Sequence, residues 1–144
     1  MRRPERLFRW LIPLAFITCA SRPPMPVAIP LDHVSCARCG MMISEARGTA
    51  QAVFAGHEPR YYDDIGCMAA DRTQWRDGHP FVSLEGGDWM AAELAWYAQP
   101  AGVRTPMGYN NLAYASADAA RAHDAHGRAR NWDALLATNG GGPR

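Results

Sequence analysis

Three short segments of the chain combine sulfur-bearing side chains with glycine. They are residues 36–42 (CARCGMM), 63–68 (DDIGCM) and 105–108 (TPMG). Glycine lets the backbone of a turn adopt conformations that other residues avoid, so each segment can wrap around a small ligand. Thiolates and thioethers together select soft ions such as Cu(I), whereas Zn(II) prefers thiolate and imidazole. The three segments are therefore candidate parts of a soft-metal site.

The pair Cys36 and Cys39 is compatible with four kinds of chemistry. A zinc site needs more ligands, and only Cys67 and His57 are available to complete one. The glycine after Cys39, with no periodic helix following it, argues against a thioredoxin-like redox pair. A disulfide would close a loop too small to stabilise much. As part of a Cu(I) site, Cys39 supplies a thiolate and Met41 a thioether from one turn.

Cys67 is a second candidate thiolate. Asp63 and Asp64 are placed to cap a helix that begins at Ile65, which puts Cys67 in the first helical turn. The helix dipole there lowers the pKa of a thiol and favours the thiolate. The alternative interpretation is that Cys67 is a small buried hydrophobic residue.

The N-terminus has the features of an export signal. Four arginines precede a short apolar run, 11–17, that is too short for a permanent membrane span of about 20 residues. The run ends at Cys19, where a bacterial lipoprotein signal has its lipidated cysteine. We expect residues 1–18 to be a signal peptide and Cys19 to be the lipid attachment site; an ordinary secretory signal is the alternative.

Removal of residues 1–18 changes the charge and the cysteine count. The whole chain has 144 residues, four cysteines and a net charge of +1, and the mature chain has a net charge of −2 and three cysteines besides Cys19. An odd number of cysteines in an exported domain suggests a free thiol or a metal ligand. The absence of lysine excludes Schiff-base and P-loop lysine chemistry. The nearly neutral charge argues against nucleic-acid binding.

The elements that must position these residues are short. We expect strands at 49–54 and 60–62 joined by the turn 55–59, a helix at 65–73, a strand at 80–84, and a mostly buried helix at 89–98. A strand pair at 103–107 and 112–115, a helix at 117–126 capped by Ser116, and one or two helical turns at 131–137 follow. The two halves repeat the order strand, strand, helix. These patterns predict an α+β fold, with two similar strand–strand–helix units.

The expected domain organisation has four parts. Residues 1–18 are the signal peptide, 19–32 a proline-rich tether anchored by lipid, 33–137 a single folded domain and 138–144 a disordered tail.

The motifs in this order resemble those of the NosL family: a lipoprotein-like start, CxxCGM, DDxGCM and TPMG. Members of that family are exported, lipid-anchored copper-binding accessory proteins of nitrous oxide reductase. The resemblance implies small antiparallel strand pairs with packed helices in two similar units, related to organomercurial lyases. It also implies one Cu(I) bound by Cys39, Met41 and Met107, with Cys36 and Cys67 as candidate additional ligands or redox partners.

We therefore expect a metallochaperone and not an enzyme. Its partners would be nitrous oxide reductase or its assembly machinery, and the membrane through the lipid on Cys19, with no nucleic acid. It would be a membrane lipoprotein that faces the periplasm, and we expect the outer membrane rather than the inner membrane. Two alternatives stay open: an organomercurial-lyase-like thiolate enzyme using Asp63 or Asp64, and a zinc-stabilised module.

Overall fold

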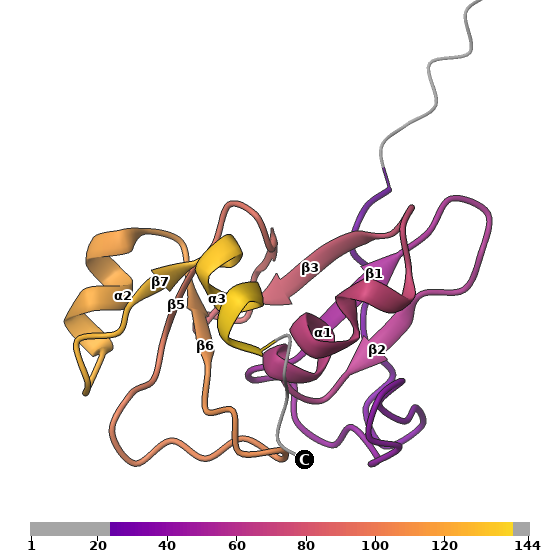
Figure 1. The fold of residues 1–144 in the computed structure, drawn as a ribbon. Helices are drawn as coiled ribbons and strands as arrows, with labels where there is room; N and C mark the ends of the chain where they lie inside the picture. The colour runs from indigo at the N-terminus through magenta and orange to yellow at the C-terminus, as the bar shows by residue number, and fades with distance from the viewer. Residues whose placement is uncertain (1–23, 140–144) are drawn as a thin grey trace, which may run out of the picture.

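The computed structural model describes residues 24–139. The expected signal peptide, Cys19 and most of the expected tail lie outside the described residues. Within them the fold is α+β, as predicted, with three short α-helices and two antiparallel sheets (Figure 1). In this part of the chain no helix has the length and apolar character needed to cross a membrane.

The first sheet has four strands in the order β2-β1-β3-β4. They are β1 (Ala50–Val53), β2 (Arg60–Tyr62), β3 (His79–Ser83) and β4 (Trp89–Ala91). The predicted hairpin at 49–62 and the predicted strand at 80–84 are confirmed, and β1 pairs with both neighbours through Ala50, opposite Tyr62 and Val82. All four residues of β1 are buried, as expected for the central strand of a sheet covered on both faces.

The predicted helix after β2 is confirmed as α1 (Ile65–Asp71), followed by the 3-10 helix η1 (Arg72–Gln74). Two consecutive buried hydrogen bonds connect the end of α1 to β2. The Tyr62 hydroxyl donates to Asp71 at 2.7 Å, and the Trp75 indole donates to Tyr62 at 3.1 Å. Burial raises the pKa of Tyr62, so its hydroxyl stays protonated and keeps donating.

The second sheet repeats the first in a smaller form. Its strands β5 (Trp96–Ala98), β6 (Leu112–Tyr114) and β7 (Arg130–Asn131) have the order β6-β5-β7, and α2 (Ala117–His123) follows β6 with Ser116 as its cap. In both sheets a hairpin leads to a capped helix, and the next strand returns to pair with the first strand of the hairpin. The repeated topology agrees with the two similar units expected from the sequence.

The predicted helix at 89–98 is wrong. This segment contains β4, a turn and then β5. Met90 pairs with Val82 of the first sheet and Tyr97 with Ala113 of the second, so the segment carries the chain from one sheet to the other. Aromatic residues favour strands when they have cross-strand partners, and here long-range pairing overrides the local helical pattern. Leu94, at the turn, is 70% exposed.

The predicted strand at 103–107 is also wrong. Thr105 and Asn110 bond to each other twice, Thr105 N to Asn110 Oδ1 at 3.0 Å and Asn110 N to Thr105 Oγ1 at 2.8 Å. These bonds curl the segment into a loop, and the expected partner strand, β6, pairs with β5 instead. Because residues 103–107 are not part of a sheet, Met107 lies in a loop.

The last helix, α3 (Trp132–Asn139), joins the two units. It confirms the helical turns expected at 131–137. Trp132 and Leu135 are buried in the same core as α1, and the Trp132 ring lies 5.8 Å from that of Tyr97 in the second sheet. A bridge between Leu84 and Ala113 also links the two sheets.

The part of the expected tether nearest the domain is packed against it. Val27 N donates to the Gln51 side chain at 3.0 Å, and Gln51 returns a bond to Val27 O at 2.8 Å. Ile29 and Leu31 pack on the core. Residues 27–32 are therefore part of the folded unit.

Candidate metal centre

The CxxCGM segment forms the tip of a hairpin. Ile43 N donates to Val34 O, Ser35 and Met42 form a bridge, and Cys36 N donates to Met41 O at 2.8 Å. Gly40 has a φ of +78°, a conformation that residues with a Cβ rarely adopt, and its amide donates back to Cys36 O. The glycine lets the turn close, and backbone bonds at both its amide and its carbonyl hold Cys36.

This hairpin tip lies across the junction between β2 and α1. Ala37 N donates to Tyr61 O on β2 at 2.8 Å, and the Arg38 guanidinium donates to Ala70 O on α1. These two contacts bring Cys36 and Cys39 next to the acidic pair that begins α1.

Asp63 and Asp64 have different roles at this junction. Asp64 is the N-cap of α1, and its Oδ1 accepts from Gly66 N at 2.8 Å. Its backbone is extended (φ −143°, ψ 132°), so neighbouring side chains point to opposite sides. Asp63 turns toward the hairpin, where the Cys39 thiol donates to its Oδ2 at 3.2 Å.

Four side chains meet at this point to form the sulfur cluster: Cys36, Cys39, Asp63 and Cys67. One donor atom of each lies within 4.8 Å of all the others. Cys36, Asp63 and Cys67 are at most 3% exposed, and Cys39 is half-buried. The three cysteines are free thiols. The structure thus brings Cys39 together with Cys36 and Cys67, which were expected only as additional candidate ligands.

The pKa values of Cys36 and Cys67 are shifted in opposite directions. A hydrogen bond from the Cys67 thiol lowers the pKa of Cys36 to about 6, with further help from the backbone amides of Cys39 and Asp63. The pKa of Cys67 is raised by the same bond and by burial, which overturns the expectation from the helix dipole. Burial also raises the pKa of Cys39, to about 11.

The third sulfur-bearing segment is bound to the start of α1. Asp64 Oδ2 accepts from Thr105 Oγ1 and from Tyr109 N. The Tyr109 ring lies against Gly66, where a Cβ would be 2.0 Å from the ring. The hairpin reaches the same helix start through the Cys39 thiol, which donates to Asp63. All three sequence motifs are therefore in contact around the first turn of α1.

The candidate methionine ligands differ in burial. Met41 is 39% exposed at the hairpin tip, and Met107 is half-buried in the loop 105–109, packed against the same core. The other methionines of these motifs differ, since Met42 is 54% exposed and Met68 is fully buried. Met68 is a core residue.

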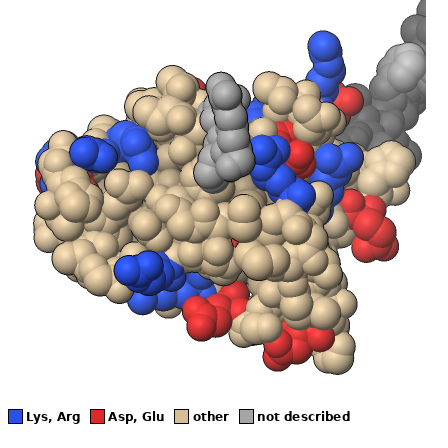
Figure 2. Space-filling view, turned by 60° about the horizontal axis from the view of Figure 1, so that its bottom comes forward, with Lys and Arg blue, Asp and Glu red and all other residues tan. Residues whose placement is uncertain are grey.

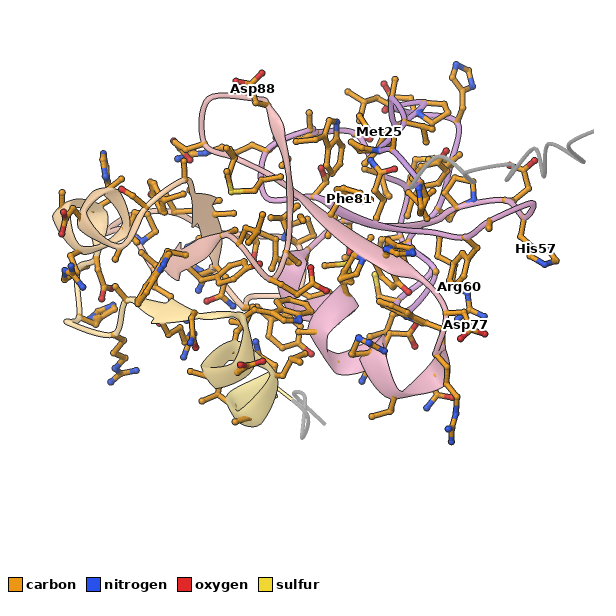
Figure 3. The ribbon with its side chains drawn as sticks, turned by 90° about the horizontal axis from the view of Figure 1, so that it is seen from above. Met25, His57, Arg60, Asp77, Phe81 and Asp88 are labelled. Atoms are coloured by element: carbon orange, nitrogen blue, oxygen red, sulfur yellow. The ribbon has the colours of Figure 1, made fainter. Side chains whose placement is uncertain are left out.

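The other sequence candidate, His57, lies away from this centre. It is an exposed residue in the turn between β1 and β2, and Figure 3 shows its side chain pointing outward from that turn. The zinc site drawn from three cysteines and His57 is therefore wrong. Asp63, and not His57, is the fourth residue that meets the three cysteines.

A cleft of about 670 Å³ is lined mainly by residues 42–45 and 102–106. Asp63 is the residue of the sulfur cluster that lines it. Asp63 Oδ1 is buried without a hydrogen-bond partner among the described residues. A buried anionic oxygen without a partner is costly, and a cation on the cluster would satisfy it.

Asp63 is the site residue that the sequence analysis missed as a ligand candidate for the favoured function. Two consecutive acids precede the helix, and a helix uses only one N-cap. The acid that does not cap the helix, Asp63, was therefore available as a ligand. Whether its side chain faces the cysteines depends on where the hairpin packs, which the sequence does not show.

The fold and the cluster together define a small α+β protein with a thiol-rich site able to hold a metal ion. A solved protein with this architecture is the copper chaperone NosL from Shewanella denitrificans. The match has a TM-score of 0.60 and 17% sequence identity, and it covers 77% of this chain and 96% of that chain. No family model matches the sequence, and no curated protein matches it. The structural match confirms the fold expected from the resemblance.

Proposed function

We propose that this protein is an exported, membrane-anchored Cu(I) metallochaperone that delivers copper to nitrous oxide reductase or to a related periplasmic copper enzyme. Cys39, Met41 and Met107 bind the ion. The observation that carries the proposal is the meeting of all three sulfur-bearing motifs around the first turn of α1. The copper chaperone with the same fold supports it.

The burial of the three ligands suits a protein that must release its cargo. Cys39 and Met107 are half-buried and Met41 is 39% exposed, so a partner's thiol, thioether or imidazole can reach the ion while some ligands stay bound. Binding of Cu(I) displaces the Cys39 thiol proton to solvent, and one thiolate and two thioethers then give a neutral complex, which limits the cost of desolvation. Transfer then proceeds by exchange of ligands, and no step requires free copper.

The surface around the centre suits contact with a protein partner. Figure 2 shows the lower side of the molecule, where charged side chains lie in groups around a broad uncharged area. Met42, next to the proposed ligands, is 54% exposed. An uncharged area rimmed by charged residues is compatible with a protein contact surface, whose core is depleted of charge and whose rim is polar.

The direction of the N-terminal segment is compatible with the proposed anchor. In Figure 1 the described chain begins in indigo at the top of the molecule, and the segment 33–43 lies toward the bottom. The N-terminal end of the described residues is therefore on the side of the domain opposite this hairpin.

The proposal is tested by measuring Cu(I) affinity in competition with a Cu(I) chelator, under reducing conditions. We expect one Cu(I) per monomer, and we expect Cys39→Ser and Met107→Ala each to weaken binding at least about tenfold, or about 1.4 kcal/mol. Met25→Ala is the matched control, because Met25 is 64% exposed and belongs to the N-terminal segment. Unchanged affinity in both ligand variants would reject this ligand set.

A thiolate enzyme of the organomercurial-lyase type is the second candidate, because Cys39 donates to Asp63 beside two other thiols. In such a reaction a cysteine sulfur bonds to the metal, and the carbon leaves with a proton from the cluster. Turnover of an organomercurial that is lost in Asp63→Asn would favour this function over the chaperone.

A further inference from the structure

The sulfur cluster contains a donor that Cu(I) does not need. Thiolates and thioethers satisfy Cu(I), whereas a carboxylate oxygen is a ligand for harder, divalent ions. Asp63 is 3% exposed, it faces three cysteine sulfurs, and its Oδ1 has no hydrogen-bond partner among the described residues. A buried carboxylate in this position points to a cation with a mixed sulfur and oxygen preference.

The geometry is compatible with a single tetrahedral ion. Zinc lies about 2.3 Å from sulfur and about 2.0–2.2 Å from a carboxylate oxygen. Ligand atoms around such an ion are therefore separated by roughly 3.5–3.8 Å, and the four donor atoms here all lie within 4.8 Å of one another. Only small side-chain adjustments would be needed.

The four ligands are held by three separate elements. Cys36 and Cys39 belong to the hairpin, which is bound to Tyr61 by Ala37 N. Asp63 lies at the end of β2, and Cys67 lies in the first turn of α1. A donor set fixed by backbone bonds in this way is preorganised, unlike the more exposed Met41.

We propose that Cys36, Cys39, Asp63 and Cys67 form a second metal site for a divalent cation with a filled d shell, such as Zn(II). Its ligand set shares Cys39 with the proposed Cu(I) site, so the two ions exclude each other. The divalent site itself does not depend on the copper function; only the competition rests on it. Binding displaces the thiol protons of the cluster to solvent and leaves three sulfur–metal bonds and one oxygen–metal bond.

The test is a titration of the reduced, metal-free protein with Co(II), a spectroscopic substitute for Zn(II). We expect one equivalent of tetrahedral Co(II) with thiolate charge-transfer bands, which Zn(II) then removes. Asp63→Asn and Cys67→Ser should each weaken Zn(II) binding at least tenfold. Met107→Ala should leave Zn(II) affinity unchanged although it weakens Cu(I), and one equivalent of Cu(I) should displace Co(II).

The outcomes separate the two proposals. Octahedral Co(II) without charge-transfer bands, or an Asp63→Asn variant that binds Zn(II) like the wild type, would overturn the divalent site. An equal loss of Zn(II) binding in Met107→Ala would do the same. Failure of Cu(I) to bind, with tetrahedral Co(II) retained, would reject the copper function and leave the divalent site standing. Circular dichroism of each metal-free variant confirms that it is folded.

Discussion

At the scale of single residues, the ionisation of the cluster is decided by contacts across the fold. The position of Cys67 at a helix start favours its thiolate, but Cys67 is fully buried and donates to Cys36. The bond stabilises the Cys36 thiolate and keeps the proton on Cys67. One direct partner in a buried site therefore outweighs the dipole of a seven-residue helix.

The lowered pKa of Cys36, about 6 against an ordinary 9.0, predicts a pH dependence of stability. Between these values the folded protein has released a proton that the unfolded chain still binds, so stability rises with pH across this window and is lost as pH falls through about 6. We expect the urea midpoint of the metal-free, reduced protein to rise accordingly. In Cys36→Ser the urea midpoint should no longer rise with pH across this window. An unchanged pH dependence in that variant would contradict the lowered pKa of Cys36.

At the scale of elements, the start of α1 organises the centre. Its cap residue Asp64 binds Thr105 and Tyr109, and Gly66 leaves the space that the Tyr109 ring fills. The loop that carries Met107 is thus positioned by a helix far away in the sequence. Changes at Gly66 should act on metal binding although Gly66 offers no ligand.

Gly66→Ala would place a Cβ 2.0 Å from the Tyr109 ring, which must then move together with its loop. We expect Cu(I) affinity to fall several-fold and stability to fall by about 1–3 kcal/mol, the usual cost of overpacking. Gly86→Ala is the matched control, since a Cβ there meets no atom within 4 Å. Equal Cu(I) affinity in both variants, measured by chelator competition, would show that this contact does not position Met107.

The hairpin at 49–62 and the starts of α1 and α2 could be predicted from sequence because their signals are local. Turn residues at 55–59 and the cap residues Asp64 and Ser116 act on neighbouring backbone groups. The segment 89–98 could not be predicted in this way. Its strands are stabilised by partners such as Val82 and Ala113, and a local pattern carries no information about distant partners.

At the scale of the whole molecule, two units with the same strand order share one core. The last helix, α3, follows the second sheet but packs on α1. Trp132 contributes to the core that contains Cys36 and Cys67, and it lies beside Tyr97. We therefore expect the two units to unfold together.

Trp132→Ala should lower the free energy of unfolding by about 3–5 kcal/mol, because it leaves a large cavity in the shared core. Leu94→Ala, at a position 70% exposed, should change it by less than about 0.5 kcal/mol. Urea unfolding followed by circular dichroism and by fluorescence should give coincident transitions in the wild type. Separate transitions for the two probes would show that the units are independent.

The sequence by itself determined the three sulfur-bearing motifs, their glycine turns, the helix caps and the α+β class. These depend on residue type and short spacing, which local physics governs. Only the tertiary structure decided that Asp63 and not His57 faces the cysteines, that the pKa of Cys36 and not that of Cys67 is lowered, and that Met107 lies in a loop bound to α1. Those outcomes depend on which distant segments pack together, because burial and direct contact set both the direction of a side chain and its ionisation.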